Sequence, residues 1–124
     1  SPEAQMLSAQ DPANPYGWLI AWPVLPEGVA APQRRATTLV GLLDGHLVCY
    51  LEPASQRLSV FGEREDWGRM TQLTPALKQV ARQSRGGLLR LDQINGVSAR
   101  SWEGMRALLQ LGFEADHQSV WLSA

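Results

Sequence analysis

The sequence is poor in cysteine, in lysine and in long apolar runs. Its single cysteine, Cys49, excludes an internal disulfide framework and fits a reducing compartment. Its longest apolar run is a handful of residues, far below the ~20 that a membrane-spanning helix needs. No basic segment followed by an apolar one marks a signal peptide. These absences predict a cytoplasmic protein without a membrane partner.

The shortage of lysine excludes one large class of nucleotide sites. A Walker phosphate loop requires glycines followed by Lys and Ser or Thr, and the one lysine, Lys78, lies in "PALKQV". The other basic residues are arginines, which suit bidentate contacts with phosphate or carboxylate but are equally typical of a GC-rich genome. The formal net charge is -1, so no global positive field draws the chain to nucleic acid. We expect no ATP site and no other cofactor site within these residues.

The residue types that bind metals or act as nucleophiles do not form a recognisable pattern. His46 and Cys49 are three apart in an expected strand, where they point to opposite faces. Glu114, Asp116 and His117 follow an expected helix, and we interpret them as a solvated loop. Cys49 has no positive neighbour to lower its pKa, so a buried, inert thiol is expected. We predict neither a metal site nor a catalytic residue.

Short apolar segments and turn residues alternate along the chain and predict an α+β fold. Residues 1–17 lack periodicity and are interpreted as an extended lead-in and interdomain connector, followed by a single domain over 18–124. Asp44-Gly45 separates two apolar runs, as is typical of a type I′ hairpin. We expect an antiparallel, barrel-like sheet of about five or six strands with two helices. Strands are predicted at 18–23, 37–43, 46–52, 57–63, 87–94 and 119–123, and helices begin at Thr74-Pro75 and at Ser101.

Two groups of basic residues could contact an anionic partner. Arg34 and Arg35 end a Pro-rich loop, from which arginines can grip phosphates. Lys78, Arg82 and Arg85 recur at i, i+4 and i+7 on one face of the first expected helix. The alternative for both groups is that they are merely solvated surface charges.

The five tryptophans divide between core and surface hypotheses. Trp102 fits the apolar face of the second helix, and Trp18, Trp22 and Trp121 lie in expected strands, so we assign these four to the core. Trp67 stands between charged neighbours in "EREDWGRM". Its position fits either a contact with a partner or a stacked base, or a flap that packs over the end of the sheet.

The order of the motifs resembles the extreme C-terminus of the Lhr (large helicase-related) family of bacterial superfamily 2 helicases. The motifs are "DPANPYGWLIAWP", "RRA" at the end of a Pro-rich loop, "DGHLVCYLE", and a helix that closes on "LGF" before a terminal strand. The resemblance implies a non-catalytic terminal module of an ATP-dependent 3′-to-5′ DNA helicase involved in DNA repair. ATP and Mg would belong to the motor of the parent protein. The preceding winged-helix region and DNA would be the partners of this module.

The resemblance leaves three hypotheses for the role of the module. The first is that it assists DNA binding or braces the winged-helix array. The second is a protein–protein module, including homo-oligomerisation. The third follows from the family's similarity to DNA glycosylases, and Asp92, Glu114 and Asp116 are its candidates by residue type alone. In the first two, Tyr16, Trp18, Trp22 and Trp67 would pack against this core or against the neighbouring domain.

Overall fold

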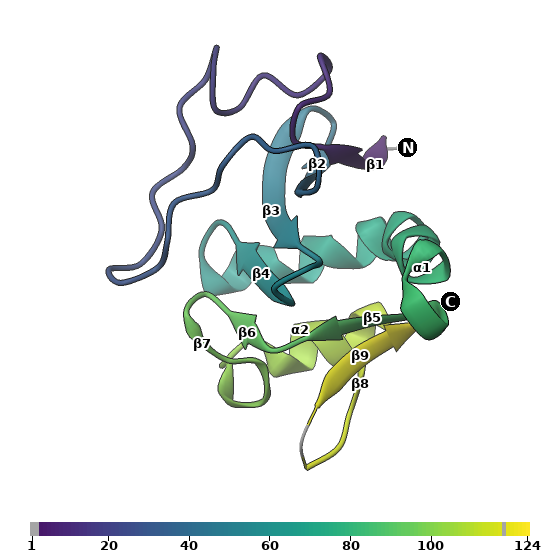
Figure 1. Cartoon of the computed structure of the whole chain (residues 1–124). Coiled ribbons are helices and arrows are strands. Elements are labelled where there is room, and N and C mark those ends of the chain that lie inside the picture. Colours follow the sequence, from purple (N-terminus) through teal and green to yellow (C-terminus); the bar gives the residue numbers. More distant parts are fainter. Residues whose placement is uncertain (1–2, 118) are drawn as a thin grey trace.

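The computed structural model describes residues 3–117 and 119–124, which form two sheets and the helices between them (Figure 1). The six-stranded sheet has the order β1-β2-β3-β4-β6-β7, and the three-stranded sheet has the order β5-β9-β8. The strands are β1 (Ala4–Ser8), β2 (Leu39–Leu43), β3 (His46–Glu52), β4 (Arg57–Val60), β5 (Leu88–Leu91), β6 (Gln93–Ile94), β7 (Val97–Ser98), β8 (Glu114–Ala115) and β9 (Val120–Ser123). The helices are the 3₁₀ segments η1 (Arg64–Leu73), η2 (Arg85–Gly87) and η3 (Ala99–Ser101), and the α-helices α1 (Thr74–Gln83) and α2 (Met105–Leu111).

The predicted α+β class is confirmed, but the predicted barrel is wrong. The larger sheet is open, with β1 and β7 at its two edges. Its pairs are antiparallel except for β4 and β6, which run parallel. In Figure 1 the sheet curls from β1 at the top toward β6 and β7 at the lower left without closing.

The hairpin at Asp44-Gly45 forms as predicted. Asp44 has φ 51° and Gly45 has φ 81°, the positive values that a type I′ turn requires at both central positions. β2 and β3 pair across this turn with Leu43 opposite His46. The prediction succeeds because the turn chemistry is local to two residues.

The extended lead-in predicted over residues 1–17 contains a strand at residues 4–8 that the sequence did not predict. β1 pairs antiparallel with β2, with Ala4 opposite Leu43 and Ser8 opposite Leu39. The predicted strand at 18–23 is wrong, because this stretch is a turn closed by a bridge between Tyr16 and Ile20. The turn forms because Gly17 adopts φ 91°.

The first helix begins differently from the prediction. Thr74 is not an N-cap, because η1 runs directly into α1, and its hydroxyl donates instead to the Leu111 carbonyl at 3.0 Å. Leu77 and Ala81 are buried along one face, as the spacing predicts. Gly86 at φ 70° follows the helix, in agreement with the prediction of a glycine stop.

The second helix is shorter than predicted. Ser101 ends η3 and does not cap α2, whose preceding residue is Gly104. Gly112 at φ 115° ends the helix, as predicted, and Phe113 is buried behind it. Trp102 is also buried, which confirms its assignment to the core.

The predicted strand at 87–94 divides between the two sheets. β5 pairs with β9, whereas β6 pairs with β4. At the junction, the N–H groups of Asp92 and Gln93 both donate to the Gln56 carbonyl, at 2.7 and 3.2 Å. Arg57 and Leu58 therefore stay beside β6 while β5 pairs elsewhere.

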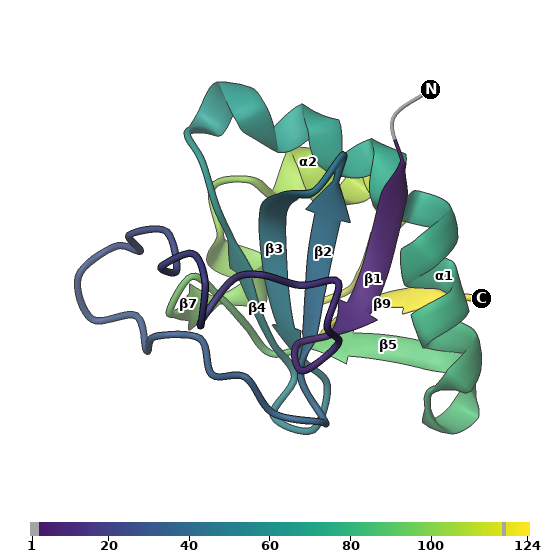
Figure 2. The same cartoon turned by 90° about the horizontal axis from the view of Figure 1, so that it is seen from above.

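The larger sheet is covered on both faces. One face, with Cys49 and Leu51, packs on α1, η1 and the second sheet in the main core. The other face, with Val40 and Tyr50, is covered by the segment between β1 and β2. Figure 2 shows this segment crossing in front of β2, β3 and β4, with α2 behind the sheet. Within the described residues, no helix is long and apolar enough to span a membrane.

Candidate functional site

The segment over the sheet, residues 9–36, is organised by Asn14, which is fully buried. Its Nδ2 donates to the carbonyl of Ala9 at 2.9 Å and to that of Tyr16 at 3.3 Å. Its Oδ1 accepts the N–H of Tyr16 at 3.1 Å. Because one amide satisfies main-chain groups on both sides of itself, it fixes the path of the chain between the prolines of "DPANPYG". Sequence reasoning missed this residue, although an Asn between two prolines is a turn signal.

Arg34 ties the two ends of the same segment together. Its Nη1 donates to the carbonyl of Asn14 at 2.6 Å and to that of Tyr16 at 3.0 Å. Its guanidinium also lies over the ring of Trp18, with Cζ 5.6 Å from the centroid. A guanidinium that donates to two carbonyls and stacks on an indole restricts all the groups that it contacts.

Aromatic contacts attach the segment to the sheet. The ring centroids of Tyr16 and Trp22 are 6.5 Å apart, and those of Trp22 and Tyr50 are 5.7 Å apart. The Tyr16 hydroxyl accepts the N–H of Leu47 at 3.3 Å. Burial raises the pKa of Tyr50, whose hydroxyl donates to the Gln33 carbonyl at 3.1 Å. Tyr16 and Trp22 therefore pack against this sheet.

Beyond these anchors the segment exposes a group of large apolar side chains. Trp18 is 61%, Leu19 69%, Ile20 47% and Val24 97% exposed. The assignment of Trp18 to the core is therefore wrong. We call the three consecutive residues Trp18, Leu19 and Ile20 the apolar tip. Exposed apolar side chains that gather on a held segment are typical of a surface that meets another protein surface.

The five basic residues predicted to contact an anion lie in different environments. Arg35 is exposed in the loop beside the partly buried Arg34. Lys78 and Arg82 are exposed on α1, where Arg82 donates to Gln79 at 2.8 Å. Arg85 stands beyond the end of α1 and lines a pocket that the other four do not line.

Trp67 is buried, which favours the interpretation as a packed flap. It lies in η1 and packs against Trp102, with ring centroids 4.7 Å apart and the ring planes tilted by 42°. Its Nε1 is buried without a hydrogen-bond partner among the described residues. The signal that could have placed it is the spacing of Trp67, Met70 and Leu73, because three residues per turn is the period of a 3₁₀ helix.

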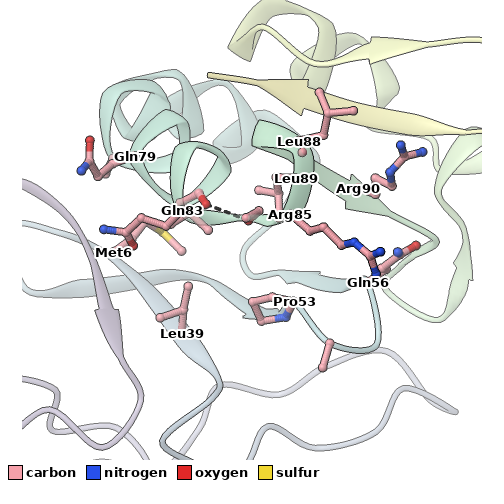
Figure 3. A pocket seen from close by; sticks show the side chains of 15 residues that line it. Met6, Leu39, Pro53, Gln56, Gln79, Gln83, Arg85, Leu88, Leu89 and Arg90 are labelled. Atoms are coloured by element: carbon pink, nitrogen blue, oxygen red, sulfur yellow. Dashed lines mark hydrogen bonds between the residues drawn. The ribbon is translucent and has the colours of Figure 1, made fainter.

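The pocket beside Arg85 has a volume of about 1020 Å³ and opens between the two sheets. Figure 3 shows Met6 and Leu39 on one side of it and Leu88 and Leu89 on the other. Its remaining walls are the β3–β4 turn, one face of α1, and Arg85 and Arg90. Of these, Arg90 was not singled out in the sequence.

The candidates for metal binding and catalysis do not converge. His46 is exposed, whereas Cys49 is buried, and burial raises the pKa of the Cys49 thiol to about 12. Asp92 is exposed at the junction of β5 and β6, whereas Glu114 lies in β8 and accepts the indole N–H of Trp121 at 3.2 Å. The part of the chain that the structure describes contains no group of three or more His, Cys, Asp or Glu placed to hold a metal.

Two curated proteins match most of this chain, whereas no family model matches it. The chain is 40% identical over 95 residues, 77% of its length, to the "Lhr helicase/ probable uracil glycosylase" of Mycolicibacterium smegmatis. It is 31% identical over 114 residues, 92% of its length, to the "Lhr helicase/uracil glycosylase" of Escherichia coli. The matches span only 6% and 7% of the lengths of these relatives. As its motifs predict, the chain belongs to the Lhr helicase family, of which it represents a C-terminal module.

Proposed function

We propose that this chain is a non-catalytic accessory module of an ATP-dependent DNA repair helicase in the cytoplasm, and that it braces the neighbouring winged-helix region of its parent protein. The matched segments are a small fraction of the relatives' length, which leaves a long parent for the module to contact. ATP and Mg would act in the motor of that parent.

The apolar tip is the observation that carries this proposal. Trp18 is 61% exposed, yet its indole N–H donates to the Asn14 carbonyl at 3.0 Å and its ring lies beside Arg34. An apolar group that is exposed but already ordered loses little conformational entropy when it docks. A neighbouring domain with an apolar surface suits such a tip better than the DNA backbone does, since phosphates offer it no apolar contact.

Binding between this chain and the winged-helix fragment of the same parent tests the proposal. The double variant Trp18→Ser/Leu19→Ser should weaken binding by about 10-fold or more in calorimetry, because buried tryptophans dominate interface energetics. The matched control is Val97→Ser, which removes another exposed apolar side chain from outside the tip. Equal affinity of the double variant and the unsubstituted chain would contradict the bracing role. Self-association that the double variant abolishes would instead support the homo-oligomer.

A second candidate function is direct assistance to DNA binding. The pattern of ion pairs favours it. The single salt bridge among the described residues joins Arg64 to Glu103, so Arg35 and Arg85 form no salt bridge there and are available for phosphates. Because Arg34 holds the loop, Arg35 is the residue to test alone. Arg35→Gln should lower the magnitude of the salt slope of DNA binding by the parent by about 1, as expected for one lost phosphate contact. An unchanged slope would exclude a phosphate contact by Arg35.

A further inference from the structure

The pocket shown in Figure 3 lies against the free edge of β5. β5 pairs with β9 on one side and has no strand on the other among the described residues. Figure 1 shows β5 as the strand of its sheet that is nearest to the larger sheet. The free edge therefore faces the gap in which the pocket opens.

The hydrogen bonds at the start of β5 show which main-chain groups lie on that edge. The N–H of Ala124 donates to the Gly87 carbonyl at 3.3 Å, so Gly87 is directed toward β9. Because successive residues of a strand direct their main-chain groups to opposite sides, Leu88 and Arg90 are directed away from β9. The Leu88 N–H donates to the Arg85 carbonyl. The Leu88 carbonyl and both main-chain groups of Arg90 therefore remain on the edge, where a further strand could pair with them.

The charged side chains of the pocket are of one sign. Arg85 and Arg90 line it, and none of the other described residues that line it is acidic. Both arginines are exposed, and neither takes part in the single salt bridge found within residues 3–117 and 119–124. Gln56 lies at the same end of the pocket in Figure 3. This end can therefore receive a carboxylate, for which a guanidinium is the best-matched partner.

The other walls of the pocket indicate which groups of a ligand would lie beside its carboxylate. They are largely aliphatic and include Met6, Leu39, Val80 and Leu88. No aromatic side chain lines the pocket among the residues that the structure describes, so a nucleic-acid base would find no ring to stack on there. These walls favour aliphatic side chains over nucleotides.

We propose that this pocket binds an extended peptide segment of another protein, in which aliphatic and acidic residues alternate, and that the segment adds to β5 as a strand. Main-chain pairing with Arg90 would supply affinity, as in other cases of strand addition. The aliphatic walls and the two guanidinium groups would supply specificity. This site is separate from the apolar tip and does not depend on the proposed bracing role.

Binding of a fluorescein-labelled, end-capped heptapeptide of alternating leucine and glutamate to the 124-residue chain tests the proposal by anisotropy. The variant Arg85→Gln/Arg90→Gln should weaken binding by about tenfold or more, the loss expected when charge-assisted hydrogen bonds are removed. The variant Arg100→Gln/Arg106→Gln, which makes the same charge change at two exposed arginines outside the pocket, should bind as the unsubstituted chain does.

A second pair of probes tests the strand pairing without changing the protein. N-methylation of every second amide removes the N–H groups along one edge of the peptide. One of the two possible N-methylated peptides should therefore lose binding while the other retains it. A peptide with glutamine in place of glutamate should bind as weakly as the peptide binds to Arg85→Gln/Arg90→Gln.

Four outcomes of the peptide-binding experiments would overturn the proposal. The first is that the heptapeptide does not bind at about 1 mM, a concentration that corresponds to a binding free energy of only about 4 kcal/mol. The second is an equal loss of heptapeptide binding in the two double variants, and the third is equal binding of both N-methylated peptides. The fourth is displacement of the heptapeptide by a decathymidylate, which would assign the pocket to nucleic acid. Sedimentation of the chain alone gives a further check. Self-association that Arg85→Gln/Arg90→Gln abolishes would assign the pocket to a second copy.

Discussion

The guanidinium of Arg34 lies 5.6 Å from the centre of the Trp18 ring, while the same side chain donates two hydrogen bonds to the carbonyls of Asn14 and Tyr16. The residue that a sequence motif offers as a phosphate ligand is thus also the residue that holds the most exposed tryptophan of the described segment in place. The contact with Trp18 and the two hydrogen bonds follow from the planar, charged guanidinium and its several N–H donors.

Replacement of Arg34 by alanine should destabilise the fold. The partly buried carbonyls of Asn14 and Tyr16 would each lose a charge-assisted donor. We expect a loss of about 2 kcal/mol in the free energy of unfolding, the usual scale for hydrogen bonds to a charged group. Urea denaturation measures this loss. Hydrogen exchange of residues 14–22 should accelerate at the same time, because the segment would open locally.

Arg35→Ala is the matched control for that variant. Arg35 is exposed, and its hydrogen bonds with Thr38 are made by its main-chain N–H and carbonyl, which the substitution keeps. We expect a change within about 0.5 kcal/mol, as is usual at such surface positions. Equal losses in the two variants would show that Arg34 does not hold the segment.

Replacement of Asn14 by alanine should cost more than replacement of Arg34. Asn14 is fully buried, and its removal leaves the Ala9 carbonyl and the Tyr16 N–H without their side-chain partner. An unsatisfied buried group costs about 1–3 kcal/mol, so we expect a loss of about 3 kcal/mol in the free energy of unfolding. Thermal unfolding followed by near-ultraviolet circular dichroism measures it, since Tyr16 and Trp22 would lose their fixed packing.

Asn14→Asp separates the two hydrogen-bonding roles of this side chain. It keeps the acceptor for the Tyr16 N–H but loses the donor to Ala9. It also places a carboxylate in a buried site, which raises the cost of the charged form. The variant should therefore gain stability as the pH falls through the raised pKa of the new carboxyl group. A pH-independent difference from the unsubstituted chain would contradict this account.

Features with a local cause could be predicted from the sequence. The hairpin at Asp44-Gly45 and the helix end at Gly112 follow from backbone conformations with positive φ, which these residue types favour. The terminal strand, β9, follows from alternation over a few residues. In each case the signal and the structure involve the same short stretch.

Features with a distant cause could not be predicted. β1 is a strand because it pairs with β2, more than thirty residues away, and its own alternation is weak. Trp18 lies in an apolar stretch that favours a strand, but Arg34 and Asn14 hold that stretch as a turn. The pocket depends on the divergence of β5 from β4, which the broken alternation at Asp92 indicates only as an irregularity.

Gly41 should not tolerate alanine. The position is buried in β2, and a Cβ there would collide with the sulfur of Cys49 and approach the sulfur of Met6 to 3.0 Å. We expect Gly41→Ala to destabilise the fold by about 1–3 kcal/mol, as overpacking usually does. Urea denaturation measures the change.

A double-mutant cycle with Cys49→Ala tests the cause of that loss. Removal of the Cys49 sulfur vacates the space that the new methyl group needs. Gly41→Ala should therefore cost less in the Cys49→Ala background, with a coupling energy of about 1 kcal/mol. Additive effects of the two substitutions would show that crowding against Cys49 is not the reason.

Cys49 should make the fold less stable at high pH. Burial raises the pKa of its thiol from 9.0 to about 12. Between these two values the folded chain keeps the thiol proton and the unfolded chain has lost it, so the unfolded state binds fewer protons. The contribution of this thiol to stability is fully present below pH 9.0 and is lost as the pH rises toward about 12, with a slope of about −1.4 kcal/mol per pH unit.

Urea denaturation of the unsubstituted chain and of Cys49→Ala at about pH 8 and about pH 10.5 isolates the contribution of the thiol, because the raised pKa of Tyr50 affects both proteins alike. The free energy of unfolding should fall more steeply with pH in the unsubstituted chain, and parallel pH profiles would show that the thiol ionises as readily in the folded state as in the unfolded one.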